Sequence, residues 1–69
     1  MLMGGELITA KNITALRPGD MVKRVNLLRR VHSVVGRYSL RLEGDDRFWD
    51  VRAPLLAVTF VQSQAETPQ

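Results

Sequence analysis

The sequence predicts an all-β fold, a small barrel of five short strands with an additional strand near the N-terminus. Apolar and polar residues alternate from Tyr38 to Glu43, as they do in a half-buried strand. Five valines lie between Met21 and Val35, and β-branched residues favour strands over helices. Stretches rich in Gly, Pro and Asp separate these segments, which is typical of the turns in a β-rich chain.

The chain has 69 residues, enough for one domain. We expect a flexible segment over residues 1–5, one β-barrel domain over residues 6–62 and a disordered tail over residues 63–69. A domain of this size buries only about 60% of the surface that its unfolded chain exposes. The sequence has no cysteine, so no disulfide can add stability, and self-association is one way to supply it.

The first half of the chain contains one clear turn and one ambiguous stretch. Glu6–Ala10 is a short strand candidate. Leu16–Asp20 contains Pro18 and Gly19, which suit the two central positions of a type II turn. The stretch from 21 to 35 fits either two strands, Met21–Val25 and Leu27–Val35, or one helix that begins after Asp20 and ends before Gly36. The helix would give an α+β fold with a three-stranded sheet. The valines favour the strands.

The second half predicts a hairpin and a last strand. Tyr38–Glu43 and Arg47–Arg52 alternate on either side of the tight turn at 44–46. The segment 53–56 interrupts the pattern, because Pro54 cannot donate a hydrogen bond to a sheet, and it suits a single 3₁₀ turn. Ala57–Gln62 is the last strand.

This pattern resembles the SH3-like small barrel of tudor and KOW-type modules, from about Leu16 to Gln62. The resemblance rests on a Pro-Gly-Asp turn before a valine-rich strand, on the two strands that follow, and on Ala53-Pro54-Leu55 before the final strand. The chain also resembles small proteins of unassigned function from actinobacteria and their phages, which share a Leu-x-Pro-Gly-Asp start and a late tryptophan. The resemblance implies a fold and a binding role rather than a reaction.

Composition gives little support to catalytic or metal chemistry. His32 is the only histidine in a chain without cysteine, so neither a tetrahedral zinc site nor a catalytic triad is indicated. Asp45 and Asp46 are explained by turn chemistry. We therefore expect a non-enzymatic protein with no cofactor and no evident small-molecule substrate. We also expect a cytoplasmic location and no membrane partner, because no segment has the roughly 20 apolar residues that span a bilayer.

Basic residues predict one candidate surface. Lys and Arg number 10 against 7 Asp and Glu, and Asp20 is the only acid among the eight cations between positions 11 and 41. Trp49 shares a strand face with Val51 and is expected in the core, which leaves Phe48 on the outer face. Sheets that bind nucleic acid combine such exposed rings with cations. The candidate nucleic-acid-binding residues are Lys23, Arg24, Arg29, Arg30, Arg37, Arg41, Phe48 and Arg52.

Apolar residues predict a second surface. Adjacent leucines at 27–28 and 55–56 cannot both point inward on a strand, so one of each pair is left for a partner or a second copy. The candidate interaction patch is Leu27, Leu28, Leu55, Leu56 and Val61. The favoured function is protein–protein interaction or regulation, with self-association as one form of it, and nucleic-acid binding is the alternative. An enzyme would need an active site shared between subunits.

Overall fold

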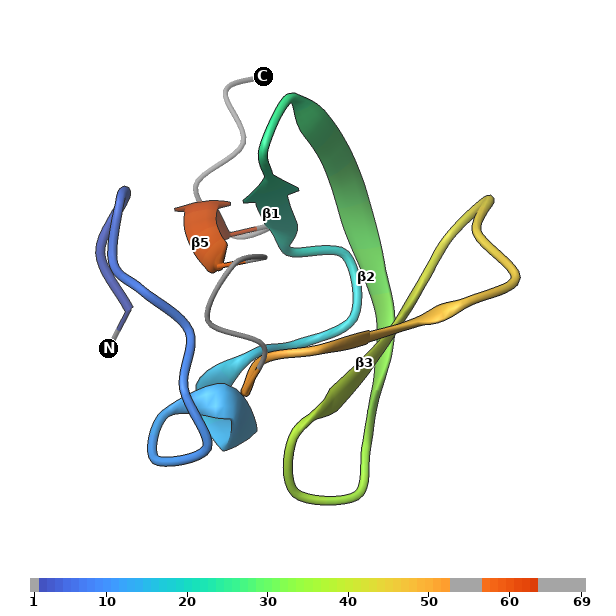
Figure 1. The fold of residues 1–69 in the computed structure, drawn as a ribbon. Helices are drawn as coiled ribbons and strands as arrows, with labels where there is room; N and C mark the ends of the chain where they lie inside the picture. The colour runs from blue at the N-terminus through green and yellow to red at the C-terminus, as the bar shows by residue number, and fades with distance from the viewer. Residues whose placement is uncertain (1, 53–56, 64–69) are drawn as a thin grey trace.

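The protein has the all-β fold that the sequence predicts. The computed structural model describes residues 2–52 and 57–63. The ambiguous stretch at 21–35 forms two strands, so the helical alternative is wrong. The elements are a 3₁₀ turn, η1 (Ile13–Ala15), and the strands β1 (Met21–Arg24), β2 (Leu27–Val35), β3 (Ser39–Leu42), β4 (Phe48–Asp50) and β5 (Val58–Gln62) (Figure 1).

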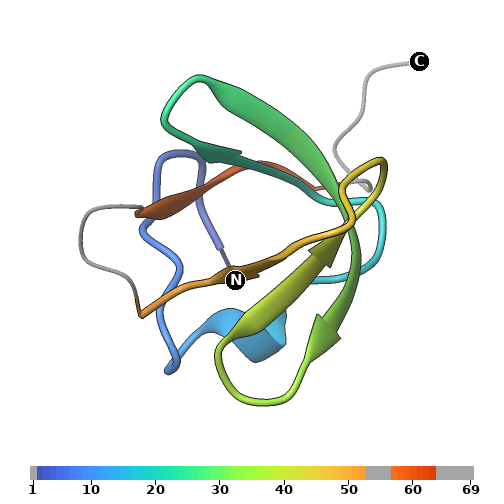
Figure 2. The same cartoon turned by 45° about the vertical axis from the view of Figure 1, so that its right-hand side comes forward.

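The strands form one antiparallel sheet in the order β4-β3-β2-β1-β5. The sheet curls so that its strands surround a common interior, a small-barrel-like arrangement (Figure 2). Among the described residues β4 and β5, the strands at the two ends of the sheet, do not pair with each other. The barrel that the sequence predicts is therefore open between β4 and β5. Segment 53–56, where a 3₁₀ turn is expected, lies outside the described residues.

A β-bulge at His32 lets a strand with irregular spacing fill the core. Val31 pairs with Leu42 and Ser33 pairs with Arg41, which are adjacent residues of β3. His32 is therefore an extra residue of β2 that has no partner of its own in β3. The side-chain alternation therefore shifts by one, and Val31 and Val34 both face the interior although they are three residues apart. The buried core consists of Leu2, Ile8, Ile13, Leu16, Val22, Val31, Leu40, Leu42, Trp49, Val58 and Phe60.

The turn at 17–20 forms as predicted and is tied to β2. Gly19 has a φ of 97°, the positive value that a type II turn requires. The Asp20 carboxylate is buried and accepts a 2.9 Å hydrogen bond from the Arg17 backbone N–H, which closes the turn from inside. The Gly19 N–H donates to the Val31 carbonyl, and the Val31 N–H donates to the Asp20 carbonyl. The turn thereby fixes where β1 begins.

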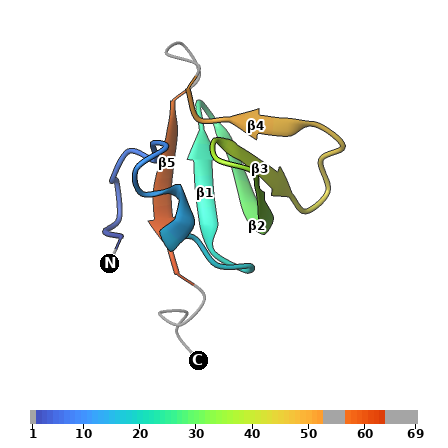
Figure 3. The same cartoon turned by 90° about the horizontal axis from the view of Figure 1, so that it is seen from below.

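The N-terminal segment pairs with β5 over a shorter range than the strand expected at Glu6–Ala10. Leu7 and Thr59 form one isolated bridge, and the Gly5 and Ile8 N–H groups donate to β5 carbonyls, so this segment lies along the outer side of β5 (Figure 3). The Asn12 side chain then accepts a 2.7 Å hydrogen bond from the Thr9 N–H and turns the chain into η1, which ends the pairing. The expected flexibility of residues 1–5 stays a prediction, although Leu2 is buried in the core.

No helix in residues 2–52 and 57–63 is both long and apolar enough to cross a membrane.

The β1–β2 connection is a tight hairpin, because Arg24 pairs with Leu27 and leaves two residues in the turn. Val25 in this turn has a φ of 57°, a left-handed conformation that β-branched residues rarely adopt. The turn therefore carries backbone strain at an exposed position.

Replacing Val25 by asparagine should stabilise the protein by about 1 kcal/mol, because asparagine tolerates the left-handed region. Chemical denaturation followed by tryptophan fluorescence measures the change. Val35→Asn is the matched control, since Val35 is also exposed but has no positive φ, and it should give no gain. A Val25→Asn protein no more stable than the wild type would show that the turn is unstrained.

Candidate functional site

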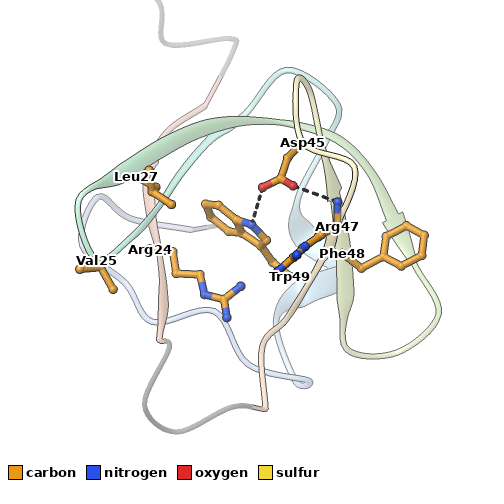
Figure 4. Close-up of a pocket in the computed structure, with 7 residues that line it drawn as sticks. All are labelled: Arg24, Val25, Leu27, Asp45, Arg47, Phe48 and Trp49. Atoms are coloured by element: carbon orange, nitrogen blue, oxygen red, sulfur yellow. Dashed lines mark hydrogen bonds between the residues drawn. The ribbon is translucent and has the colours of Figure 1, made fainter.

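A pocket of about 430 Å³ lies between the β1–β2 hairpin and β4. The pocket lies beside the outer edge of β4, and no strand in the described part of the chain pairs with that edge. We call it the Trp49 pocket. Its lining residues, drawn in Figure 4, are Arg24, Val25 and Leu27 from the hairpin, Asp45 and Arg47 from the β3–β4 loop, and Phe48 and Trp49 from β4.

The polar part of the Trp49 pocket is organised by one carboxylate. Trp49 is 3% exposed, and its indole N–H needs a hydrogen-bond acceptor because burying it unpaired costs free energy. The indole N–H donates to Asp45 Oδ2 at 3.1 Å, and the Arg47 backbone N–H donates to Asp45 Oδ1 at 2.9 Å. Both carboxylate oxygens are therefore engaged within the protein, and the β3–β4 loop is held against β4 (Figure 4).

These contacts favour the ionised form of Asp45. The hydrogen bond from the Arg47 backbone, followed by that from the Trp49 indole, lowers the pKa of Asp45 below its usual value, and the charges of Arg29 and Arg47 act in the same direction. Partial burial opposes the shift but does not reverse it. Asp45 is thus an anion that accepts one hydrogen bond at each oxygen, from the Arg47 backbone in its own loop and from the Trp49 indole in β4.

Arg24 lies on the other wall of the Trp49 pocket. Alternation along β1 places it on the same face as the buried Val22, and its guanidinium lies 5.4 Å from the centroid of the Trp49 ring. Such a cation–π contact orients the side chain and contributes about 0.5–1 kcal/mol at a partly exposed site. Together with Arg47, the pocket lining holds two guanidinium groups against the single carboxylate of Asp45, so it attracts anions.

The rim of the Trp49 pocket is apolar and exposed. Val25 is 65% exposed and Leu27 is 48% exposed, and both lie at the tip of the β1–β2 hairpin. Phe48 is 57% exposed, but its ring points away from the pocket toward the outer face (Figure 4). Apolar contact with a ligand therefore falls to Val25 and Leu27, with the Trp49 indole beneath.

A second cluster fixes Arg52 at the end of β4. Its guanidinium forms an ion pair with the Asp50 carboxylate, with 2.7 Å between Arg52 Nη2 and Asp50 Oδ2. The same guanidinium lies 3.8 Å from the centroid of the Tyr38 ring. The hydrogen bonds from the Arg52 side chain and backbone lower the pKa of Asp50 to about 2. Arg52 is therefore already occupied by partners within the protein and is a weaker candidate for a phosphate than its sequence position indicated.

The structure separates most of the cations that the sequence grouped. Arg24 and Arg29 lie toward the interior side of the β1–β2 hairpin, whereas Lys23 and Arg30 lie on the outer face. Arg37 is in the turn beyond the far end of β2. Arg41 pairs with Phe48 across β3 and β4, so these two side chains share the outer face.

The predicted apolar patch is also divided. Leu27 and Leu28 are each 48% exposed but face opposite sides of β2, and only Leu27 lines the Trp49 pocket. Val61 is exposed on β5. Leu55 and Leu56 lie outside the described residues.

Sequence reasoning missed the pocket role of four residues. Trp49 was assigned to the core and Asp45 to turn chemistry, and both assignments agree with the structure, but neither Val25 nor Arg47 was singled out. One signal was available. A buried tryptophan needs an acceptor, and an aspartate lies four residues before it in the adjoining turn.

Asp45→Asn should lower the free energy of unfolding at neutral pH, because an amide offers one oxygen where the carboxylate accepts two hydrogen bonds. The folded-state pKa of Asp45 lies below the usual 3.8, so the advantage of the wild type is complete above that value and disappears as the pH falls through the folded-state pKa. Urea denaturation followed by the fluorescence of Trp49, the one tryptophan, from neutral pH to about pH 2 measures this.

Asp46→Asn is the control, because Asp46 is an exposed acid in the same turn without these two bonds. It should stay close to the wild type in stability. If the gap between Asp45→Asn and the wild type were the same at every pH, the ionised carboxylate would not be the stabilising group.

No protein-family model matches the sequence. Neither the curated proteins nor the solved structures contain a significant match.

Proposed function

We propose that this protein is a small non-enzymatic binding module that docks a segment of a partner protein in the Trp49 pocket. The pocket itself carries the proposal. It combines an exposed apolar rim, a buried indole and two guanidinium groups in about 430 Å³ at an open side of the sheet. Binding sites commonly consist of such an apolar surface with a few fixed polar groups that orient the ligand.

The strand order supports the further proposal that the fold is SH3-like. Each strand from β1 to β4 pairs with its neighbour in sequence, and β5 returns to pair with β1. The binding surface would then be built from the β1–β2 and β3–β4 connections on a rigid sheet, where loop residues can vary without loss of the core.

The strained turn at Val25 supports binding at this rim. A β-branched residue with positive φ costs free energy in the unbound protein, and such strain concentrates at functional sites. Here the strained residue is Val25, whose side chain is 65% exposed and lies at the mouth of the Trp49 pocket. Burial of that side chain under a partner would recover about 25 cal/mol for each Å² of apolar surface removed from water.

Nucleic-acid binding is the second candidate, and one observation favours it. The exposed Phe48 ring and the Arg41 side chain are cross-strand neighbours on the outer face, next to the Trp49 pocket. A base could stack on the ring while the cation contacts a phosphate. We rank it second because the remaining predicted cations divide between both faces of the sheet and the β2–β3 turn.

Selection of a random-peptide display library on the immobilised chain tests the first proposal. Peptides that are enriched should bind the wild type and bind Leu27→Ser about tenfold more weakly, because a wall of the pocket is removed. Leu28→Ser is a matched control, since Leu28 has the same residue type and the same 48% exposure on the opposite face. Fluorescence anisotropy with the enriched peptides measures both affinities.

Three results would contradict the proposal. Equal losses in the two variants would place binding outside the Trp49 pocket. A stable dimer that Leu27→Ser dissociates would make a second copy the occupant. Failure to enrich any peptide, together with salt-dependent binding of oligothymidylate that Phe48→Ala abolishes, would favour the nucleic-acid function.

A further inference from the structure

We infer that the Trp49 pocket takes an extended acidic segment, which adds a strand to the open edge of β4 while Arg24 and Arg47 bind its carboxylate. This inference rests on the proposed function and names the chemistry of the partner. It depends on three properties of the described chain: the orientation of the β4 backbone, the coverage of the opposite sheet edge, and the balance of charge in the pocket.

The backbone of β4 directs hydrogen-bonding groups away from the sheet. The Val51 N–H donates to the Tyr38 carbonyl at 2.8 Å, and in the same register Leu40 is opposite Trp49. In an antiparallel pair these groups point alternately toward and away from the neighbouring strand. The N–H and C=O of Phe48 and Asp50 therefore point away from β3, and no residue within 2–52 or 57–63 forms a backbone hydrogen bond with them.

The other edge of the sheet is already covered. The N–H groups of Gly5 and Ile8 donate to the Phe60 and Val58 carbonyls, and the Phe60 N–H donates to the Glu6 carbonyl. The N-terminal segment thus occupies the outer side of β5, whereas β4 ends the sheet on the opposite side (Figure 3). An incoming strand could therefore form hydrogen bonds with the unpaired N–H and C=O groups of β4. Such strand addition is a common way to bind peptides.

The charge of the pocket selects an acid. The two hydrogen bonds that Asp45 accepts come from the Arg47 backbone and the Trp49 indole, and neither involves Arg24. The charge of Arg24 acts on Asp50, which is already bound to Arg52. Arg24 instead lies over the Trp49 ring with its guanidinium directed across the pocket (Figure 4). A carboxylate between Arg24 and Arg47 would gain charge-assisted hydrogen bonds, whereas a basic residue would meet two like charges.

The pocket also fixes how the segment alternates. Neighbouring strands lie about 4.8 Å apart, and successive side chains of the added strand would point to opposite faces of the sheet. The face shared with Trp49 would receive the acidic residue, with apolar residues two positions away against Leu27 and Val25. Acetyl-Leu-Val-Glu-Val-Leu-amide has this pattern, and the analogue with glutamine in place of glutamate removes only the charge.

Titration of the ¹⁵N-labelled full chain with these two peptides tests the inference. The glutamate peptide should bind about tenfold more tightly than the glutamine peptide and should shift the resonance of the Trp49 indole N–H. On binding, the amide protons of Phe48 and Asp50 should exchange with solvent at least tenfold more slowly. The Trp49 amide faces β3 in either state and is the internal reference.

Charge-neutral variants test the acid recognition separately. Arg24→Gln and Arg47→Gln should bind both peptides with nearly equal affinity, so that the preference for glutamate is lost. Arg37→Gln should keep the full preference, because it removes the same charge from a turn away from the pocket. A ¹H–¹⁵N spectrum with the wild-type dispersion establishes that each variant is folded.

The outcomes separate this inference from the proposed function. Equal binding of the two peptides to the wild type would overturn acid recognition but leave a peptide-docking pocket. Binding without slower exchange at Phe48 and Asp50 would overturn strand addition. No binding of either peptide at millimolar concentration would overturn the inference even if library selection yields other ligands. If oligothymidylate, and neither peptide, shifts the resonances of the Trp49 pocket, both the inference and the proposed function would be overturned.

Discussion

The buried indole of Trp49 imposes the requirement on which the site depends. Its ring is part of the apolar core, but its N–H must find an acceptor that the apolar core does not offer. Asp45 supplies that acceptor from the β3–β4 loop and uses its second oxygen to hold the Arg47 backbone. The loop conformation and one wall of the pocket thus depend on the burial of a single side chain.

Local patterns in the sequence predict most of the fold. The alternation at Tyr38–Glu43 and the valines between Met21 and Val35 correspond to strands, and Pro18-Gly19 forms the expected turn. Two features were not predicted. The bulge at His32 depends on which residue of β2 pairs with β3, which is decided by tertiary packing rather than by residue propensity. η1 follows a local contact instead, the hydrogen bond from the Thr9 N–H to the Asn12 side chain three residues later.

The candidate site was less predictable because it joins segments that are distant in sequence. Alternation alone correctly placed Trp49 inside and Phe48 outside. It could not show that the hairpin tip at Val25 faces the β3–β4 loop, because that approach results from the curl of the whole sheet. Counting cations overestimated their convergence for the same reason: Arg29 and Arg30 are neighbours in sequence but point to opposite faces.

An open strand edge is a liability in a small protein, because it invites pairing between copies. Here β4 has only three residues, and Asp50 at its end is bound to Arg52, so a long edge-to-edge contact is disfavoured. The net charge of +3 also makes two copies repel each other. The same positive charge lowers the free energy of approach for an acidic segment. The charge of the protein can therefore favour an acidic segment over the β4 strand of a second copy at the β4 edge, and this preference requires no change in the core.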